Sequence, residues 1–402
     1  MSTMLIRNGR VLDVESGDYL TSSRLRITDG VVVEIGPSLT ATGGDTIDAG
    51  DRVVMPGLID AHVHPMLSSL DVGSLRDQPV TLLAQKARIE MEHMLRRGFT
   101  TARDACGGDR GLADAVATGL INGPRLFVSG RALSQTGGHG DSRTASDFCA
   151  AHSDVAARIA DGVAEVRRAA REELKAGADQ LKIMASGGVA SPSDEIWTLQ
   201  YTVEEMRAVV EEAAARRTYV LAHAYTAEAI TRAVTAGVRS IEHGNLLDAD
   251  AAALMAEHSV FLVPTLITYQ KIHELGGQFG MPAGQRRKVT DVIDAGLGSL
   301  KLARDAGVEI GFGSDLLGEL QVHQSGEFRV RSRVEEPIET IRSATIVNAQ
   351  LLGVAGEVGV LRPGAQADLL IVDGDPLSDA TELADPDRID LVLRAGQVRY
   401  GR

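Results

Sequence analysis

The chain has 402 residues, of which 44% are hydrophobic and 24% charged, a composition typical of a globular protein with one large domain and one smaller one. Its net charge of −14 argues against nucleic acid or an anionic membrane as the main partner, because both attract clusters of Lys and Arg. The sequence shows no signal peptide, no apolar run long enough to span a bilayer and no metal-type spacing of its two cysteines, Cys106 and Cys149. We therefore expect a cytoplasmic protein that acts on a small molecule.

Both ends of the chain have the pattern of short strands joined by turns. In "MLIRNGRVLD" and "SRLRITDGVVVEIG", apolar and polar residues alternate around Asn-Gly and Asp-Gly turns. The segments "GVLRPGAQADLLIVDGDP" and "DRIDLVLRAGQVRYGR" repeat this pattern near the other end. We predict that residues 1–56 and 356–402 meet in space as one discontinuous β-sandwich domain, with a different domain over residues 57–355.

The middle of the chain alternates between strand-like and helix-like segments. Helical periodicity occurs near 80–97, 161–177, 202–216, 226–236, 248–257, 285–306 and 337–352, with a short helix at 111–119 and a long loop region after residue 129. The expected strands are 58–64, 99–104, 124–129, 179–184, 218–223, 238–243, 259–264 and 308–315. Eight strands separated by helices predict an α/β fold, a (β/α)8 TIM barrel, whose active site lies at the C-terminal ends of the strands.

Two histidines end the first expected barrel strand, in "GLIDAHVHP". His62 and His64 are two residues apart, so strand alternation points both imidazoles into the mouth of the barrel. A His-x-His pair alone is weak evidence, because histidine often serves as a hydrogen-bonding residue of the surface or core. Its position at a strand end favours a metal site.

Three more candidate ligands end other expected strands: His223 in "TYVLAHAY", His243 in "VRSIEHGN" and Asp315 in "VEIGFGSD". Gly311 and Gly313 precede Asp315 at inward positions and are expected to leave room at the centre. Each residue alone has a structural reading, as a core histidine or a helix cap. Together they predict a site for divalent metal, because imidazole and carboxylate are its usual ligands.

Lys182, in "DQLKIM", lies in an apolar run where a lysine normally faces solvent. If the strand alternates, Gln180, Lys182 and Met184 face inward, so the lysine points at the same cavity as the histidines. A protonated amine there would repel metal ions. Burial and nearby cations favour the neutral amine, which CO2 converts into a carbamate anion able to bridge two cations.

These residues together resemble the amidohydrolase superfamily. "VVMPGLIDAHVHP" resembles the entry to its first barrel strand, and "GVLRPGAQADLLIVDGDP" resembles its closing β-sandwich segment. The resemblance implies two divalent ions, usually zinc, with a bridging hydroxide and N6-carboxylysine at Lys182. It assigns His62, His64 and Asp315 to one ion, and His223 and His243 to the other.

Within that superfamily, "TTARDACGG", "GGHGD", "LKIMASGGV" and "LAHAYT" resemble the prolidase and carboxypeptidase branch, which cleaves dipeptides or N-acyl amino acids. By the same resemblance, His139 and Tyr225 are candidates for substrate contact. The other reading of His139 is an incidental residue in a mobile Gly-rich loop, and Tyr225 is equally compatible with packing.

The implied reaction is metal-assisted hydrolysis of an amide C–N bond. The bridging hydroxide would attack the carbonyl, Asp315 would carry the proton to the leaving amine, and His139 would help stabilise the oxyanion. We further expect a homo-oligomer. Spacing ties no arginine to the substrate carboxylate, for which Arg103, Arg329 and Arg331 are unweighted candidates.

Three alternatives remain open. The same metal centre would also cleave aryl amides, ureas or carbamates. The mononuclear deaminases of the superfamily share His62, His64, His223 and Asp315 with this sequence but lack the bridging lysine. The third alternative is a non-catalytic scaffold, which fits poorly because such relatives typically lose metal ligands.

Overall fold

The computed structural model describes residues 2–41, 43–144, 146–147, 155–191 and 194–401. Cys149 lies outside the described residues, whereas Cys106 is buried and free. Within the described part of the chain, no helix has both the length and the apolar character that a bilayer crossing requires.

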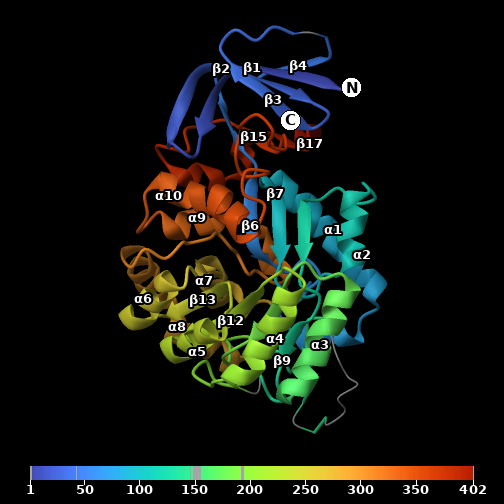
Figure 1. The fold of residues 1–402 in the computed structure, drawn as a ribbon, viewed down its shortest axis with the longest axis vertical. Helices are drawn as coiled ribbons and strands as arrows, with labels where there is room; N and C mark the ends of the chain where they lie inside the picture. The colour runs from blue at the N-terminus through green and yellow to red at the C-terminus, as the bar shows by residue number, and fades with distance from the viewer. Residues whose placement is uncertain (1, 42, 145, 148–154, 192–193, 402) are drawn as a thin grey trace.

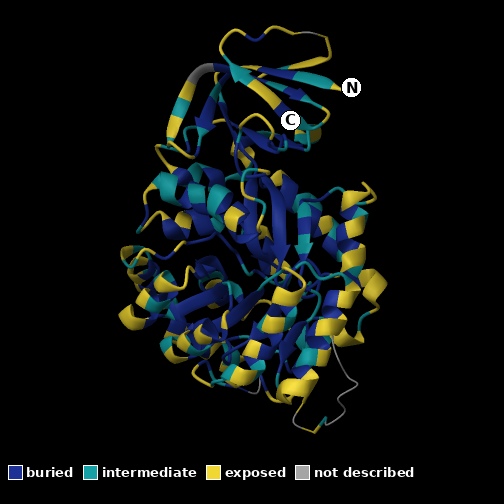
Figure 2. Cartoon of the chain, in the orientation of Figure 1, coloured by how far each residue is buried: buried dark blue, intermediate teal, exposed yellow. Residues whose placement is uncertain are grey.

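The fold is a (β/α)8 barrel with a small β domain built from both ends of the chain (Figure 1). Parallel strands form most of the barrel wall, and most of their side chains are buried, as Figure 2 shows for the centre of the molecule. In chain order these strands are β6 (Leu58–Val63), β7 (Phe99–Asp104), β8 (Arg125–Val128), β11 (Leu181–Met184), β12 (Val220–Thr226), β13 (Ser240–Leu246) and β14 (Phe261–Val263).

The eighth wall segment, residues 308–315, closes the barrel without forming a regular strand. On one side, the Gly311 amide donates to the Leu262 carbonyl at 2.8 Å in β14. On the other side, the Ala61 amide donates to the Phe312 carbonyl and the Asp315 amide donates to the His62 carbonyl, both at 2.8 Å. The end of this segment therefore lies directly beside the end of β6.

Helices cover the outside of the barrel, and the expected ones begin and end within a few residues of their predicted limits. Several start at a capping side chain; Thr202 and Glu205, for example, form a reciprocal capping box. These helices are α1 (Val80–Arg96), α2 (Arg110–Ala117), α3 (Gly162–Ala176), α4 (Val203–Ala215), α5 (Ala227–Ala236), α6 (Ala249–Glu257) and α8 (Ala283–Asp305).

Besides the closing segment 308–315, the structure differs from the predicted elements in three places. The loop region expected after residue 129 contains β9 (Ala132–Ser134) and β10 (Ala157–Ile159), which are too short to show a strand period and extend the sheet from β11. The helix expected over 337–352 is divided into α10 (Pro337–Arg342), a π-helical turn (Ser343–Val347) and α11 (Asn348–Leu351). The sequence reading also missed several helical elements: η1 (Val72–Asp77), α7 (Leu266–Leu275), η2 (Gly318–His323), α9 (Gly326–Arg331), η4 (Ala380–Ala384) and η5 (Pro386–Arg388).

The strands from both ends of the chain join in one sheet. They are β1 (Thr3–Asp13), β2 (Asp18–Thr28), β3 (Val31–Gly36), β4 (Asp45–Asp48), β5 (Val53–Pro56), β15 (Leu369–Val372), β16 (Ile389–Arg394) and β17 (Gln397–Gly401). The two halves meet where β5 pairs antiparallel with β15, in the order β17-β16-β15-β5-β1-β2-β3, while β4 pairs with β1. The domain boundaries at 56/57 and 355/356 stay a prediction.

Strand β15 joins this sheet to the barrel, because its successive side chains point to opposite faces. Leu369 and Ile371 are buried in the core of the terminal sheet, whereas Leu370 and Val372 belong to the core that includes Met91 of α1. A buried carboxylate, Asp368, adds an ion pair at 2.5 Å to Arg125 of β8. The β domain therefore rests on the β7–β8 side of the barrel.

Gly311 and Gly313 do not leave an open space, contrary to the expectation from the sequence. A Cβ on Gly313 would lie 2.4 Å from Val263 Cγ1 and 2.8 Å from His62 Cβ, and one on Gly311 would lie 2.6 Å from Asn348 Oδ1. The glycines instead allow the closing segment to pack closely between β14 and β6.

We predict that Gly313→Ala lowers the free energy of unfolding by about 1–3 kcal/mol, because the added methyl group overpacks the seam beside His62. Urea-induced unfolding measures this effect. The matched control is Gly298→Ala in α8, where an added Cβ meets no atom within 4 Å. The control should raise stability by roughly 0.5–1 kcal/mol through helix propensity. Equal effects at the two positions would contradict the tight seam.

Candidate metal centre and active site

A cavity of about 280 Å³ opens at the C-terminal ends of the barrel strands. The side chains proposed from the sequence as metal ligands or as substrate contacts all border this one cavity. Its lining includes His62, His64, His139, Lys182, His223, Tyr225, His243 and Asp315. Metal binding by these residues stays a prediction, and the positions of their donor atoms determine how well they suit a metal ion.

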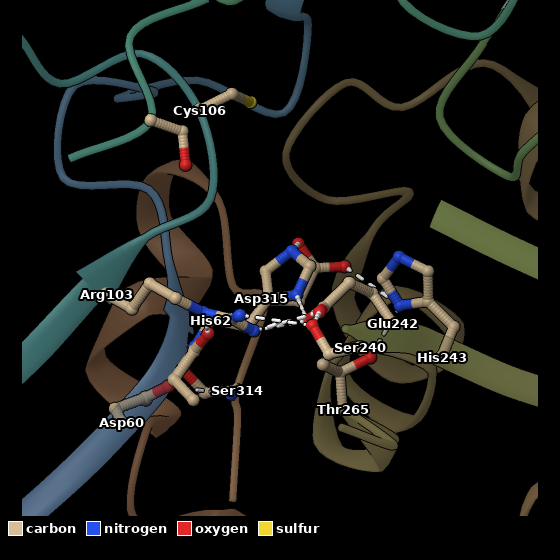
Figure 3. A network of polar contacts seen from close by, with 12 residues as sticks. Asp60, His62, Arg103, Cys106, Ser240, Glu242, His243, Thr265, Ser314 and Asp315 are labelled. Atoms are coloured by element: carbon tan, nitrogen blue, oxygen red, sulfur yellow. Dashed lines mark hydrogen bonds and ion pairs between the residues drawn. The ribbon is translucent and has the colours of Figure 1, made fainter. Parts of the chain in front are cut away.

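His62 and His64 both direct Nε2 at the same carboxylate oxygen, Asp315 Oδ1, at 3.3 and 3.0 Å (Figure 3). The other ring nitrogen of each histidine is already occupied. His62 Nδ1 lies 2.6 Å from Glu242 Oε2, and His64 Nδ1 lies 3.0 Å from the Cys106 carbonyl oxygen. These partners are acceptors, so each Nδ1 carries a proton, and Nε2 is the ring nitrogen that faces Asp315.

Unprotonated Nε2 atoms of the two imidazoles would repel the Asp315 carboxylate unless a proton or a metal ion lay between them. Burial raises the pKa of Asp315, but the charge and hydrogen bonds of His62 and His64 outweigh it and hold that pKa well below its usual value. Burial lowers the pKa of His64, but the Cys106 thiol and Asp315 outweigh it and raise that pKa well above the usual value. The two imidazoles and the Asp315 carboxylate therefore fit a divalent cation. Without a metal ion, a proton shared between imidazole and carboxylate takes its place.

His243 and His223 extend the donor set across the cavity. Among the described residues, single ligand atoms of His62, His243 and Asp315 lie within 4.8 Å of one another. His223 Nε2 donates to the Gly187 carbonyl at 3.0 Å, which leaves its Nδ1 unprotonated, and its ring centroid is 4.6 Å from that of His243. Burial lowers the pKa of both rings well below the usual value, so both are neutral and able to bind metal.

Lys182 faces the same cavity from β11 and is only 2% exposed. Its neighbours Leu181 and Ile183 face the helices instead, as strand alternation predicted. Burial lowers the pKa of the Lys182 amine although the charges of Glu242 and Asp315 raise it. The prediction of an inward lysine is therefore confirmed, and its environment favours the neutral amine that carboxylation needs.

His139 and Tyr225 also border the cavity. The His139 ring stacks on His223 with centroids 4.3 Å apart, and a Cβ on Gly188 would come within 2.1 Å of the His139 ring. The Tyr225 hydroxyl accepts a hydrogen bond from Tyr269 at 3.1 Å. Packing holds both side chains at the wall of the cavity, and a role of either one in substrate contact stays a prediction.

Glu242 is the main residue that the sequence analysis missed. It lies below the cavity with Arg103, both fully buried, and each of its carboxylate oxygens accepts from Arg103 Nη2 at 2.9 Å (Figure 3). Burial raises the pKa of Glu242, but Arg103 and His62 outweigh it and hold that pKa well below its usual value. The charged pair therefore fixes the orientation of His62 from beneath.

Strand alternation itself concealed Glu242. With His243 expected inward, strict alternation would place its neighbour Glu242 on the outer face. The structure places Ser240 and Glu242 inward and Ile241 outward, and a left-handed backbone at His243, with φ 77°, then turns this ring into the cavity. The sequence signal that could have revealed Glu242 was an acidic residue in one barrel strand and a basic residue, Arg103, in another. Opposite charges within such strands are expected to pair inside the barrel.

Asp60 and Glu327 are further buried acids without an assigned role in the sequence reading. Asp60 accepts hydrogen bonds from the Ser314 hydroxyl at 2.6 Å and from the His62 amide at 3.0 Å, which ties β6 to the closing segment. Glu327 of α9 accepts from the Ile267 amide at 2.7 Å at the start of α7, and burial raises its pKa to about 7. Both residues position backbone that carries cavity side chains.

None of the three arginines considered for a substrate carboxylate lines the described part of the cavity. Arg103 is committed to Glu242, and Arg331 binds Glu335, the Gly311 carbonyl and Ser343. Arg329 lines a different pocket. Carboxylate recognition by one of these residues is therefore excluded.

Comparison with known proteins gives matches over most of the chain. The model of the Amidohydrolase family matches residues 53–399. Ochratoxinase of Aspergillus niger is 33% identical over 368 residues, which cover 87% of this chain and 76% of that protein. A solved prolidase, complexed with N-methylphosphonate-L-proline, has a TM-score of 0.97 and 48% identity over 99% of each chain. A Xaa-Pro dipeptidase with bound methionine has a TM-score of 0.88 and 29% identity over 100% of each chain.

We predict that Glu242→Gln lowers the free energy of unfolding by about 3–5 kcal/mol, because it leaves the buried Arg103 guanidinium without a counter-charge. Chemical denaturation measures the loss. The exposed Glu309→Gln is the control and should change stability by no more than about 0.5 kcal/mol. Adding Arg103→Met to Glu242→Gln should recover part of the loss. A single variant as stable as the control would show that the pair does not support the site.

Proposed function

The chain belongs to the amidohydrolase family, as its motifs predicted, and from this membership and the donor geometry we propose that it is a binuclear metal-dependent hydrolase that cleaves the amide bond of dipeptides or N-acyl amino acids. The single observation that carries the proposal is the convergence of the Nε2 atoms of His62 and His64 on one oxygen of the Asp315 carboxylate. A buried cluster of this kind at strand ends of a barrel is suited to metal-assisted hydrolysis.

We assign one divalent ion, zinc by family precedent, to His62, His64 and Asp315, and a second to His223 and His243. Carboxylated Lys182 would bridge the two, which is consistent with its burial and with the lowered pKa of its amine. When bound, such ions activate water near neutral pH and polarise a carbonyl group.

The side chains of the cavity then have separate tasks. Asp315 accepts the proton that the attacking water loses and returns it to the nitrogen of the leaving amine as the C–N bond breaks. His139, stacked on His223 at the cavity wall, donates a hydrogen bond to the developing oxyanion. Glu242 and Arg103 keep His62 in the tautomer that presents Nε2.

A substrate carboxylate would be recognised by neutral hydrogen-bond donors, because no lining arginine is present among the described residues. Tyr225, Tyr269 and Gln285 line the cavity and can donate. The similarity to a prolidase and to a Xaa-Pro dipeptidase, both over nearly the full chain, supports an amino-acid leaving group.

A second candidate substrate class is an amide, urea or carbamate with a bulky aryl group. The lining of the cavity supports it, because beside the polar residues it includes a set of apolar side chains: Leu67, Leu70, Val72, Val189, Ile272 and Leu317. The mononuclear deaminase reading is disfavoured by the inward position of Lys182. The scaffold reading is disfavoured by the presence of all six ligand candidates at one cavity.

The test is a substrate panel with the zinc-loaded protein in bicarbonate. We predict hydrolysis of dipeptides and N-acyl amino acids, at least tenfold slower turnover of matched compounds whose carboxylate is amidated, and loss of activity on chelation that zinc restores. Faster cleavage of aryl amides lacking a carboxylate would select the second substrate class. No cleavage of any amide by a fully metallated protein would refute the hydrolase proposal.

A second prediction concerns the proposed bridging role of Lys182. Lys182→Ala should lower turnover by about a hundredfold or more and reduce the metal content from two ions per chain towards one. Short carboxylic acids should restore part of the activity by occupying the place of the carbamate. Lys182→Arg is the control for charge, because a guanidinium cannot form the carbamate under these conditions. Full activity of Lys182→Arg, or one ion per chain in the unaltered protein, would contradict the bridging role.

A further inference from the structure

A second cavity, of about 250 Å³, lies on the flank of the barrel, between α7, η2, α9 and the turn that joins η4 to η5. Helix α7 separates it from the active-site cavity. Tyr269 and Ile272 of this helix line the active-site cavity, whereas Gln270 and Lys271 line the flank cavity. The two cavities are therefore distinct, although one helix borders both.

The flank cavity is cationic in a chain whose net charge is −14. Lys271, His323, Arg329 and Arg333 line it, and none of its described lining residues is acidic. Glu274 contacts Lys271 at 2.6 Å and offsets that one charge. Burial and the nearby Lys271 lower the pKa of His323, so this ring serves as a neutral hydrogen-bonding group.

The two arginines have no ion-pair partner among the described residues. They lie four residues apart on α9 and the turn that continues it, where the Ser332 amide still donates to the Phe328 carbonyl at 3.1 Å. Like charges at this spacing on a helix repel each other. An anion bound between them would remove that repulsion and accept hydrogen bonds from both guanidinium groups.

An unsatisfied hydroxyl points independently to a ligand. Ser325 lines the cavity and is 3% exposed, and its Oγ has no hydrogen-bond partner within the described residues. Buried hydroxyl groups are normally hydrogen-bonded, because leaving one unpaired costs free energy. An oxygen of a bound anion in the cavity would provide the missing acceptor.

We propose that this flank cavity is a binding site for a small dianion that carries a phosphate or a carboxylate group. Arg329 and Arg333 supply the charge, Lys271 adds a third cation shared with Glu274, and Ser325 supplies a hydroxyl donor. Because the site lies outside the catalytic cavity, its occupant is not the substrate of the hydrolysis proposed above.

The experiment measures binding of inorganic phosphate to the zinc-loaded protein by calorimetry at low ionic strength. The double variant R329Q/R333Q should bind phosphate at this site at least tenfold more weakly than the unaltered protein. The control is R168Q/R207Q, which removes two exposed arginines from α3 and α4 and changes the net charge equally. We expect the control to keep the full stoichiometry and R329Q/R333Q to bind one phosphate fewer per chain.

Two further arms test the chemistry. Ser325→Ala should weaken phosphate binding by about threefold, the effect of one lost hydrogen bond. Succinate, titrated in the same way, shows by its affinity relative to phosphate whether the site prefers a dicarboxylate. Identical isotherms in R329Q/R333Q and in the control would overturn the proposal. So would phosphate that acts only as a competitive inhibitor with one site per chain in every protein, because it would then bind only in the catalytic cavity.

Discussion

The closure of the barrel between residues 308–315 and β6 determines the arrangement of the whole site. The Asp315 amide binds the His62 carbonyl at 2.8 Å, and Asp60 holds the Ser314 hydroxyl at 2.6 Å. These contacts place the Asp315 carboxylate opposite the two imidazoles of β6. Gly313 makes them possible, because any side chain there would collide with Val263 and His62. Ligand geometry is therefore a consequence of how the last wall segment meets the first strand.

Charged and titratable side chains form one layer below the seam between residues 308–315 and β6, and a second layer above it. The lower layer consists of Arg103 and Glu242, which are fully buried and compensate each other's charge. Glu242 also accepts the His62 Nδ1 proton, so the lower layer fixes which ring nitrogen reaches the upper layer. The upper layer concentrates neutral imidazoles, one carboxylate and a lysine whose pKa is lowered by burial. A buried set of donors with so little positive charge of its own is best stabilised by added cations.

The sequence allowed the barrel and the candidate metal ligands of the cavity to be predicted, because the strands that carry them show local periodicity. Alternation along β11 correctly turned Lys182 inward, and the His-x-His spacing correctly placed both rings on one side. The features that failed depend on distant contacts or on exceptions to periodicity. Helix α7 begins after Thr265, with φ 49°, and its first amides are held by Glu327, a residue from another helix. Strands β9 and β10 have three residues each, too few to show a pattern. These elements form because residues that are distant in the sequence pack against them and bond to them.

The left-handed residues of the cavity explain why periodicity fails where the chemistry is placed. His243, Asp315 and Thr265 have φ values of 77°, 51° and 49°, although none is glycine. Backbone of this kind costs on the order of 1–3 kcal/mol per residue and persists only when surrounding contacts impose it. Here His243 contacts both of the others: its Nδ1 lies 2.8 Å from Thr265 Oγ1 and 3.8 Å from Asp315 Oδ2. A regular strand end would direct alternate side chains away from the cavity. The left-handed turn at His243 allows two consecutive residues of β13 to point towards the barrel interior, Glu242 in the lower charge layer and His243 in the upper one. The backbone strain at these positions therefore brings a supporting carboxylate and a candidate metal ligand to the same strand end.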